Sequence, residues 1–291
     1  MLGAYHDFYS KGDRMKRIAS IQDISCLGRC SLTVALPVIS AMGVECAIVP
    51  TAVLSTHTMF KNFTVCDLSD QILPIARHWQ DEKVHFDAIY TGYLASAEQI
   101  GDVCAFFDML TAEDTMLFVD PAMADHGKLY PGFGPEFPAE MAKVAARADV
   151  LIPNLTEACL LTGAEYKEEY DEAYIKDLLH RLVALGAKKA ILTGVSFEAG
   201  KVGVMTYDGA TGEYFTYVNE KMPQSFHGTG DIFSSVVMGG LMRDMSMEEA
   251  LKLAVDYTLE CIRITNREEI WYGVEFERAI PMLCERLKEA E

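Results

Sequence analysis

Short apolar runs rich in β-branched residues alternate along this chain with longer amphipathic runs. Such alternation is typical of a mostly parallel β-sheet that carries helices on both faces. The predicted strands cover residues 17–22, 46–51, 88–91, 116–120, 150–153, 190–193, 202–207 and 214–218. The predicted helices cover residues 31–42, 69–80, 97–110, 136–147, 156–161, 172–185, 230–243, 247–267 and 275–289. The pattern therefore predicts an α/β fold of three layers.

Local breaks refine this prediction. Pro37 and Pro74 fall inside two predicted helices, which we expect to start later or to kink. The last two strands are separated by the turn 208–212, so they read as a hairpin that adds an antiparallel edge to the sheet. No linker or repeat divides the chain, and we expect one domain over residues 15–291 after a polar extension at 1–14.

Composition narrows the class of protein. The chain has 291 residues, of which 50% are hydrophobic, and a formal net charge of -18. That charge argues against nucleic acid or an anionic membrane surface as a partner, because both need clustered Lys and Arg. The eight cysteines are scattered and mostly lie in apolar runs, as expected for reduced thiols of a cytosolic protein. No run reaches transmembrane length and no signal peptide is recognisable.

The segment 227–231, His-Gly-Thr-Gly-Asp, opens directly into an apolar helical run. Glycines at 228 and 230 let successive backbone N–H groups turn toward one point, to which the helix adds the positive end of its dipole. A carboxylate at Asp231 would repel an anion held there unless a hydroxyl lies between them, so the pattern fits a base that deprotonates an alcohol attacking phosphate. A glycine-rich turn with an acidic residue in the first helical turn explains the same residues.

Polar residues follow several other predicted strands, where the ligand lies in open α/β sheets. Asp120 could reach a nucleotide-bound magnesium ion through water, or could close a turn with its proline neighbour. Asn154 and Glu157 could bind a phosphate oxygen and metal-bound water, or could cap the next helix. Thr193 and Gly194 could approach phosphates, or could form a tight turn. A Walker sequence and a dinucleotide-binding glycine pattern are both absent.

Taken together, four segments resemble those of the pyridoxal (pyridoxine/pyridoxamine) kinases of the ribokinase-like superfamily. They are TGYLASAEQ at 91–99, DPAM at 120–123, PNLTE at 153–157 and GTGD at 228–231. The resemblance spans roughly residues 16–270, and the order of the four segments makes it specific. It implies a ribokinase-like α/β/α sandwich and transfer of the γ-phosphate of ATP to a B6 vitamer.

The resemblance also implies a role for each matching residue. Asp231 would be the base, and the backbone of Gly228, Thr229 and Gly230 would form an anion hole. Asp120, Asn154 and Glu157 would arrange Mg²⁺ and the ATP phosphates, the two carboxylates acting through water, while Thr193 and Gly194 would touch the nucleotide. Thr51 and Tyr93 would line the pyridine pocket. A homodimer and a K⁺ requirement are further implications.

One position departs from the family, because Asp23 stands where these kinases commonly carry a serine. It could pair with a ring nitrogen or a ring hydroxyl, or Ser25 could make the contact instead. A hydroxymethylpyrimidine kinase could use the same carboxylate and is the nearest alternative function. A non-catalytic ligand-binding protein on the same scaffold is the alternative of another class. The loop 124–130 is expected to close over ATP and exclude water.

Overall fold

The computed structural model describes residues 14–224, 226–266 and 268–289. Within these ranges one mixed sheet of nine strands runs in the order β11-β10-β9-β8-β5-β4-β1-β2-β3. Its parallel part comprises β1 (Arg17–Ser25), β2 (Glu45–Leu54), β4 (Ala88–Thr91), β5 (Met116–Val119), β8 (Val150–Leu151) and β9 (Lys189–Val195). Antiparallel strands complete both edges, namely β3 (Val65–Asp67), β10 (Lys201–Asp208) and β11 (Tyr214–Glu220).

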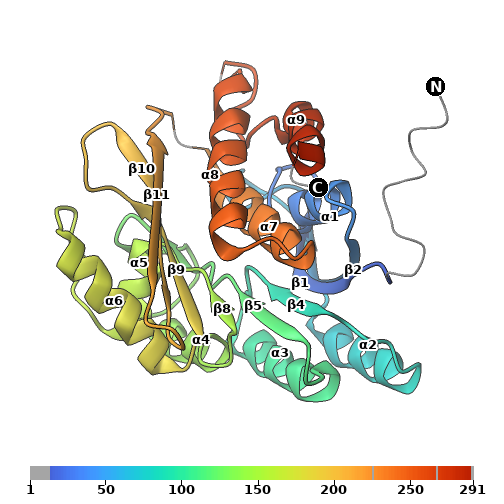
Figure 1. Cartoon of the computed structure of the whole chain (residues 1–291). Coiled ribbons are helices and arrows are strands. Elements are labelled where there is room, and N and C mark those ends of the chain that lie inside the picture. Colours follow the sequence, from blue (N-terminus) through green and yellow to red (C-terminus); the bar gives the residue numbers. More distant parts are fainter. Residues whose placement is uncertain (1–13, 225, 267, 290–291) are drawn as a thin grey trace.

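Helices cover both faces of this sheet (Figure 1). One layer holds α2 (Ser69–Asp81), α3 (Ala97–Leu110), α4 (Phe137–Ala145), α5 (Leu155–Thr162) and α6 (Glu172–Leu185). The other holds α1 (Leu32–Ala41), α7 (Thr229–Met242), α8 (Met247–Ile264) and α9 (Phe276–Glu289). The predicted three-layer ribokinase-like α/β/α sandwich with an antiparallel edge hairpin is confirmed.

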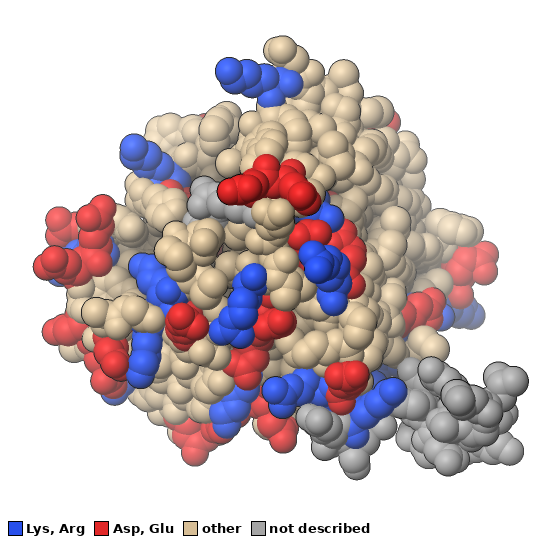
Figure 2. Space-filling view, turned by 90° about the horizontal axis from the view of Figure 1, so that it is seen from above, with Lys and Arg blue, Asp and Glu red and all other residues tan. Residues whose placement is uncertain are grey.

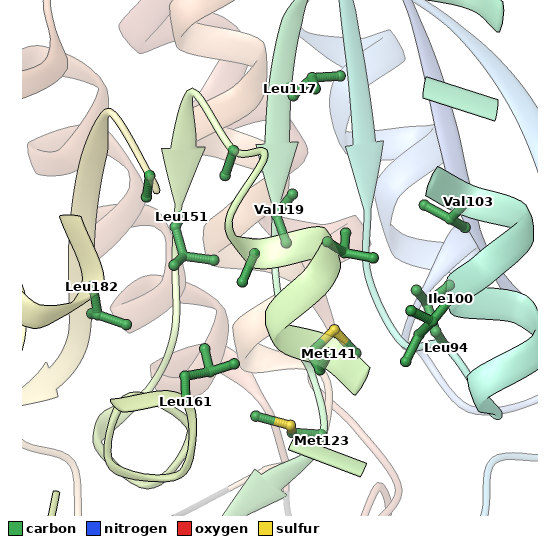
Figure 3. Close-up of a cluster of buried hydrophobic side chains, with 14 of the residues drawn as sticks. Leu94, Ile100, Val103, Leu117, Val119, Met123, Met141, Leu151, Leu161 and Leu182 are labelled. Atoms are coloured by element: carbon green, nitrogen blue, oxygen red, sulfur yellow. The ribbon is translucent and has the colours of Figure 1, made fainter. Parts of the chain in front are cut away.

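Successive side chains of each central strand point to opposite faces of the sheet, so the molecule has two hydrophobic cores, one under each layer of helices. On β5, Leu117 and Val119 point into the core under α3–α6, whereas Phe118 between them points into the core under α7 and α8. Figure 3 shows Val119 beside Leu151 of β8, with Met141 of α4 in the same cluster and Leu117 farther along β5. Because both faces of the central strands are buried, these strands read as continuous apolar runs in the sequence.

Several boundaries differ from the sequence prediction. Strand β1 continues to Ser25, so Asp23 lies inside the strand, at a register irregularity between Gln22 and Ile24. Helices α1 and α2 are continuous through Pro37 and Pro74, so the expectation that they start after these residues is wrong. Strand β3 and the small hairpin of β6 (Ala124–Asp125) and β7 (Lys128–Leu129) were not predicted, because two- and three-residue strands carry no readable period.

The start of β1 is tied to the sheet by a buried carboxylate. Asp87 Oδ2 accepts the backbone N–H of Arg17 at 2.7 Å, and its Oδ1 accepts Nη2 of Arg14 at 2.7 Å. The predicted extension at 1–14 therefore ends inside the fold at Arg14, while residues 1–13 lie outside the described residues. None of the helices in the described part of the chain is long and apolar enough to cross a membrane.

We expect Asp87→Asn to lower the free energy of unfolding by about 1–2 kcal/mol, because the charge-assisted bond to Arg14 is lost. Urea unfolding measures this change. Asp114→Asn is the matched control, since Asp114 is exposed and forms an ion pair with His85 across 3.4 Å, and it should change stability by less than about 0.5 kcal/mol. Equal losses in the two variants would contradict the account.

Candidate active site

The predicted site residues gather where the parallel strands end. Asp23 lies near the end of β1, and Tyr93 follows β4, which neighbours β1 in the sheet. Asp120 follows β5, and its backbone N–H donates to Thr91 of β4 at 2.9 Å. Asn154 follows β8 and forms an isolated parallel bridge with Thr193 of β9. The carboxyl ends of five neighbouring strands thus supply one polar edge, as ligand sites in open α/β sheets require.

Helix α7 begins at this edge with the predicted glycine turn. Gly228 is the N-cap, with a left-handed φ of 82°, and a Cβ there would lie 2.1 Å from the carbonyl oxygen of Arg29. Only glycine fits this position. Nothing lies within 4 Å of the place a Cβ would take at Gly230, so the turn is open on that side. The first-turn N–H groups of Thr229, Gly230 and Asp231 have no acceptor inside the helix and can receive an anion.

Asp231 occupies the first turn of α7 with a perturbed carboxyl group. Burial is the main reason that its pKa is raised to about 7; the backbone N–H of Ser31 acts against burial, and the nearby charge of Asp23 adds to it. Ser31 lies in a turn with two non-glycine residues at positive φ, itself and Arg29, both at 51°. Such backbone strain is common where a functional group must be held in place. A carboxylate that titrates near neutral pH is suited to accept a proton.

A second buried carboxylate, that of Asp23, lies near Asp231. Asp23 is 5% exposed and accepts the hydroxyl of Ser25 at 3.1 Å, and the hydroxyl of Ser31 also bonds to it. Burial raises the pKa of Asp23 above its ordinary value, and these hydroxyl groups lower it less. The charge of Asp23 acts on Asp231, on Tyr93 and on the thiol of Cys30. The predicted residues Ser25, Tyr93 and Asp231 therefore all interact with Asp23.

Two histidines that were not selected from the sequence, His57 and His227, lie on the Asp23 side of the site. The ring of His57 is 4.5 Å from that of His227, and its charge state also affects Asp23. His57 Nδ1 accepts the N–H of Met59 at 3.2 Å, so its Nε2 carries the proton and donates to the carbonyl of Tyr272 at 2.9 Å. Burial lowers the pKa of both rings, that of His227 to about 4. Both histidines are therefore neutral at pH 7.

Asp120 is held by the same helix that carries Asp231. Its Oδ2 accepts the hydroxyl of Ser234 at 2.8 Å, one turn after Asp231 on α7. Burial raises the pKa of Asp120 well above its ordinary value, and the charges of Glu157 and Asp231 add to the effect. Ser234 was missed in the sequence, although its spacing of three residues from Asp231 places both on one side of the helix.

Glu157 and Asn154 form a capping box at the start of α5. Glu157 Oε2 accepts the N–H of Asn154 at 2.9 Å, while Asn154 Oδ1 accepts the N–H of Glu157 at 3.0 Å. The remaining oxygen of Glu157 accepts the N–H of Met123 at 3.0 Å, and Asn154 Nδ2 donates to the carbonyl of Ala124 at 2.7 Å. Of the two interpretations of this motif, the helix cap is the one present in the structure, and it also anchors the hairpin β6–β7.

The other predicted residues have simpler surroundings. The side chain of Thr51 is buried, and within the described part of the chain its hydroxyl has no hydrogen-bond partner, whereas its carbonyl accepts Nε2 of Gln99 at 3.3 Å. Thr193 donates its hydroxyl to the carbonyl of Pro153 at 3.4 Å. Gly194 has a φ of 75° and open space around it. Gln99, the last residue of the TGYLASAEQ segment, forms hydrogen bonds with Thr51, Ala95 and Ser69, so it joins this motif to β2 and to the start of α2.

Surface charge does not form a basic face on the view in Figure 2, where lysine and arginine lie among aspartate and glutamate. No group of three or more His, Cys, Asp or Glu side chains among the described residues has the arrangement of a protein-only metal site.

Comparison with known proteins finds similar kinases. A protein from Bacteroides thetaiotaomicron, named as a phosphomethylpyrimidine kinase and solved with pyridoxal, is 37% identical, with a TM-score of 0.88 over 93% of this chain and 96% of that one. Pyridoxal kinase from Lactobacillus plantarum is 30% identical, with a TM-score of 0.86 over 95% and 99% of the two chains. Arabidopsis thaliana pyridoxal kinase is 25% identical over 86% of this chain and 82% of its own. The family model described as phosphomethylpyrimidine kinase matches residues 34–274, and the chain belongs to this family of kinases.

Proposed function

We propose that this chain transfers the γ-phosphate of ATP to the 5′-hydroxymethyl group of a B6 vitamer. The observation that carries the proposal is Asp231, a carboxyl group with a pKa of about 7 in the first turn of a helix that begins with an open glycine turn. Relatives solved with pyridoxal, or with ADP and pyridoxamine, support both substrates. A homodimer and a K⁺ requirement stay predictions from the family resemblance.

The chemistry follows from the positions of these groups. Asp231 takes the proton of the hydroxymethyl group as its oxygen attacks the γ-phosphorus in line. The N–H groups of Thr229 and Gly230, with the α7 dipole behind them, stabilise the charge on the transferred phosphoryl group. The backbone N–H of Ser31 keeps the carboxylate oriented. Thr193 and Gly194, beside Asn154 at the neighbouring strand ends, lie where the nucleotide would extend.

One observation indicates that the site suits magnesium, namely the raised pKa of Asp120. That carboxyl group is buried next to Glu157 and Asp231 and has hydroxyl and backbone donors, so a nearby cation would stabilise its charged form. Asp120 would hold the ion through water, whereas both oxygens of Glu157 already accept backbone N–H groups, and Glu157 would act by holding residues 123–124. When bound, the ion neutralises phosphate charge.

Hydroxymethylpyrimidine kinase is the second candidate function. The family description favours it, and a curated hydroxymethylpyrimidine/phosphomethylpyrimidine kinase of Aquifex aeolicus is 28% identical over 44% of this chain. Matches over most of the chain carry both names, since pyridoxal kinases cover 86% and 95% of it and the Bacteroides protein named as a phosphomethylpyrimidine kinase covers 93%. That last protein was solved with pyridoxal, which supports a B6 vitamer as the substrate. A non-catalytic binding protein does not explain a buried carboxyl group at the phosphoryl position, because that charge weakens anion binding.

Asp231→Asn should lower kcat by about 10²–10⁴-fold while leaving the affinity for the vitamer nearly unchanged, because only proton removal is lost. Coupled ATP consumption and ligand titration measure the two quantities. Asp70→Asn is the matched control, since Asp70 is the acidic residue in the first turn of α2 and should leave turnover unchanged. If Asp231→Asn keeps full turnover, its carboxylate serves the helix alone and the proposed mechanism is wrong.

The raised pKa of Asp231 predicts opposite effects of pH on activity and stability. The base must be ionised, so kcat/KM should fall about tenfold per pH unit below pH 7. The folded state binds this proton more tightly than the unfolded state, so its contribution to stability is full below pH 4 and is lost as pH rises through 7. Asp231→Asn should therefore have a higher Tm than the wild type at pH 8, and the difference should vanish near pH 4. A lower Tm at pH 8 would contradict the assignment.

Gly228→Ala should lower kcat by at least about 10²-fold, because a Cβ there overlaps the carbonyl of Arg29 and displaces the anion-binding N–H groups. Gly101→Ala, in α3 with open space around it, is the control and should be neutral or slightly stabilising. Steady-state kinetics and circular dichroism would separate lost catalysis from lost folding. Normal kinetics in Gly228→Ala would show that this turn does not bind the phosphoryl group.

A further inference from the structure

The turn at residues 28–31 has a conformation that its own sequence does not favour. Arg29 and Ser31 both have a φ of 51°, a region that residues with a side chain seldom adopt. Ser31 is the N-cap of α1, yet its side chain makes no cap bond to that helix. Its hydroxyl bonds to Asp23 and its backbone N–H to Asp231 instead. Contacts from elsewhere in the fold must therefore stabilise this turn.

The turn meets the start of α7 at two points. The backbone N–H of Ser31 bonds to the carboxyl group of Asp231. The carbonyl oxygen of Arg29 lies against Gly228, where an added Cβ would be only 2.1 Å away from it. The first contact orients the carboxylate and the second lies behind the glycine turn. A displacement of residues 28–31 would therefore change where Asp231 lies relative to the N–H groups of that glycine turn.

Helix α9 and the segment before it hold the turn from the other side. Arg29 Nε donates to Oε1 of Glu277, in the first turn of α9, at 3.0 Å, although the two residues are 248 positions apart. The guanidinium carbon of Arg29 also lies 5.8 Å from the ring centroid of Tyr272. The backbone at Gly273 packs so closely that a Cβ there would lie 2.8 Å from the Cβ of Arg29. The last part of the chain thus contacts the turn that orients Asp231.

Stability alone does not explain this ion pair. The side chains of Arg29 and Glu277 are 21% and 49% exposed, and pairs with such exposure contribute little to folding. Arg29 Nη1 is buried and has no hydrogen-bond partner within the described part of the chain, which makes the arrangement less favourable still. A strained turn held by a pair that adds little stability is typical of a functional constraint.

We propose that Arg29 and Glu277 are positioning residues, whose ion pair holds the turn 28–31 so that Asp231 faces the reacting hydroxyl group beside the glycine turn. The proposal rests on the proposed function, since it takes Asp231 to be the base. The effect passes along the backbone from Arg29 to Ser31, and neither member of the ion pair takes part in the chemistry.

Amide hydrogen exchange of the full chain tests the hold on the turn without using activity. Arg29→Ala and Glu277→Ala should each speed exchange at residues 28–33 by about 10-fold or more, because the turn opens more easily without the pair. Glu277→Ala changes a half-exposed side chain, so it keeps the test available if Arg29→Ala does not fold. Exchange at the wild-type rate in these variants would overturn the proposal.

Arg147→Ala is the matched control. Arg147 forms an ion pair with Asp108, and its guanidinium carbon lies 5.3 Å from the ring centroid of Phe107, so it has the same two kinds of contact as Arg29. It precedes β8 and therefore lies at the opposite edge of the sheet from the site. This variant should leave both kcat and exchange at residues 28–33 unchanged.

Kinetics distinguish positioning from a general loss of structure. Arg29→Ala and Glu277→Ala should each lower kcat by about 10–100-fold, while the KM values for ATP and pyridoxine change less than about threefold. The Tm should stay within about 3 °C of the wild type. Glu277→Gln keeps an acceptor for Arg29 and should recover most of kcat. The double variant should be no slower than the slower single variant, because both changes remove one contact.

Failure of this proposal and failure of the proposed function give different results. If the wild type phosphorylates a vitamer and both alanine variants keep full kcat, the positioning role is wrong and the function stands. An equal fall of kcat in Arg147→Ala would also overturn the positioning role. If exchange at residues 28–33 rises as expected but wild-type protein phosphorylates no vitamer, the proposed function fails and the hold of Arg29 and Glu277 on the turn stands.

Discussion

The site depends on burying four carboxyl groups, those of Asp23, Asp120, Glu157 and Asp231, at one edge of the sheet. Burial raises the pKa of each, because their described partners are hydroxyl and backbone N–H groups, which stabilise the charged form less completely than a cation would. The empty protein therefore holds uncompensated negative charge or extra protons at this edge. We propose that this edge receives ligands that supply positive charge, such as a magnesium-bound nucleotide.

The carboxyl groups have different hydrogen-bond partners. Glu157 accepts three backbone N–H bonds and fixes the start of α5 together with the hairpin β6–β7. Asp120 is joined to α7 through Ser234, so one helix holds both Asp120 and Asp231. Asp231 interacts with one strained turn through Ser31, whose hydroxyl also bonds to Asp23. A single turn thus connects Asp231 to Asp23.

The sequence predicts the layers, the mostly parallel sheet with its antiparallel edge hairpin and the glycine turn, because these depend on local periodicity and on the spacing of a few residues. It could not distinguish the cap at Asn154 from a phosphate ligand, since one pattern of side chains suits both roles and only the position of residues 123–124 decides between them. His57, Ser31 and Ser234 were missed for a related reason. Their partners, Tyr272, Asp231 and Asp120, lie far away in sequence or across a turn whose backbone angles no local pattern specifies.

The central claim is that an alcohol oxygen held at Asp231 becomes the phosphate ester oxygen. The most direct measurement is ³¹P NMR of a reaction of the full chain with ATP, Mg²⁺ and pyridoxine, followed by mass spectrometry of the product. The account predicts a single phosphate monoester on the 5′-hydroxymethyl oxygen, formed together with an equal amount of ADP. Release of inorganic phosphate without an ester, or a product that carries the phosphate on another oxygen, would contradict it.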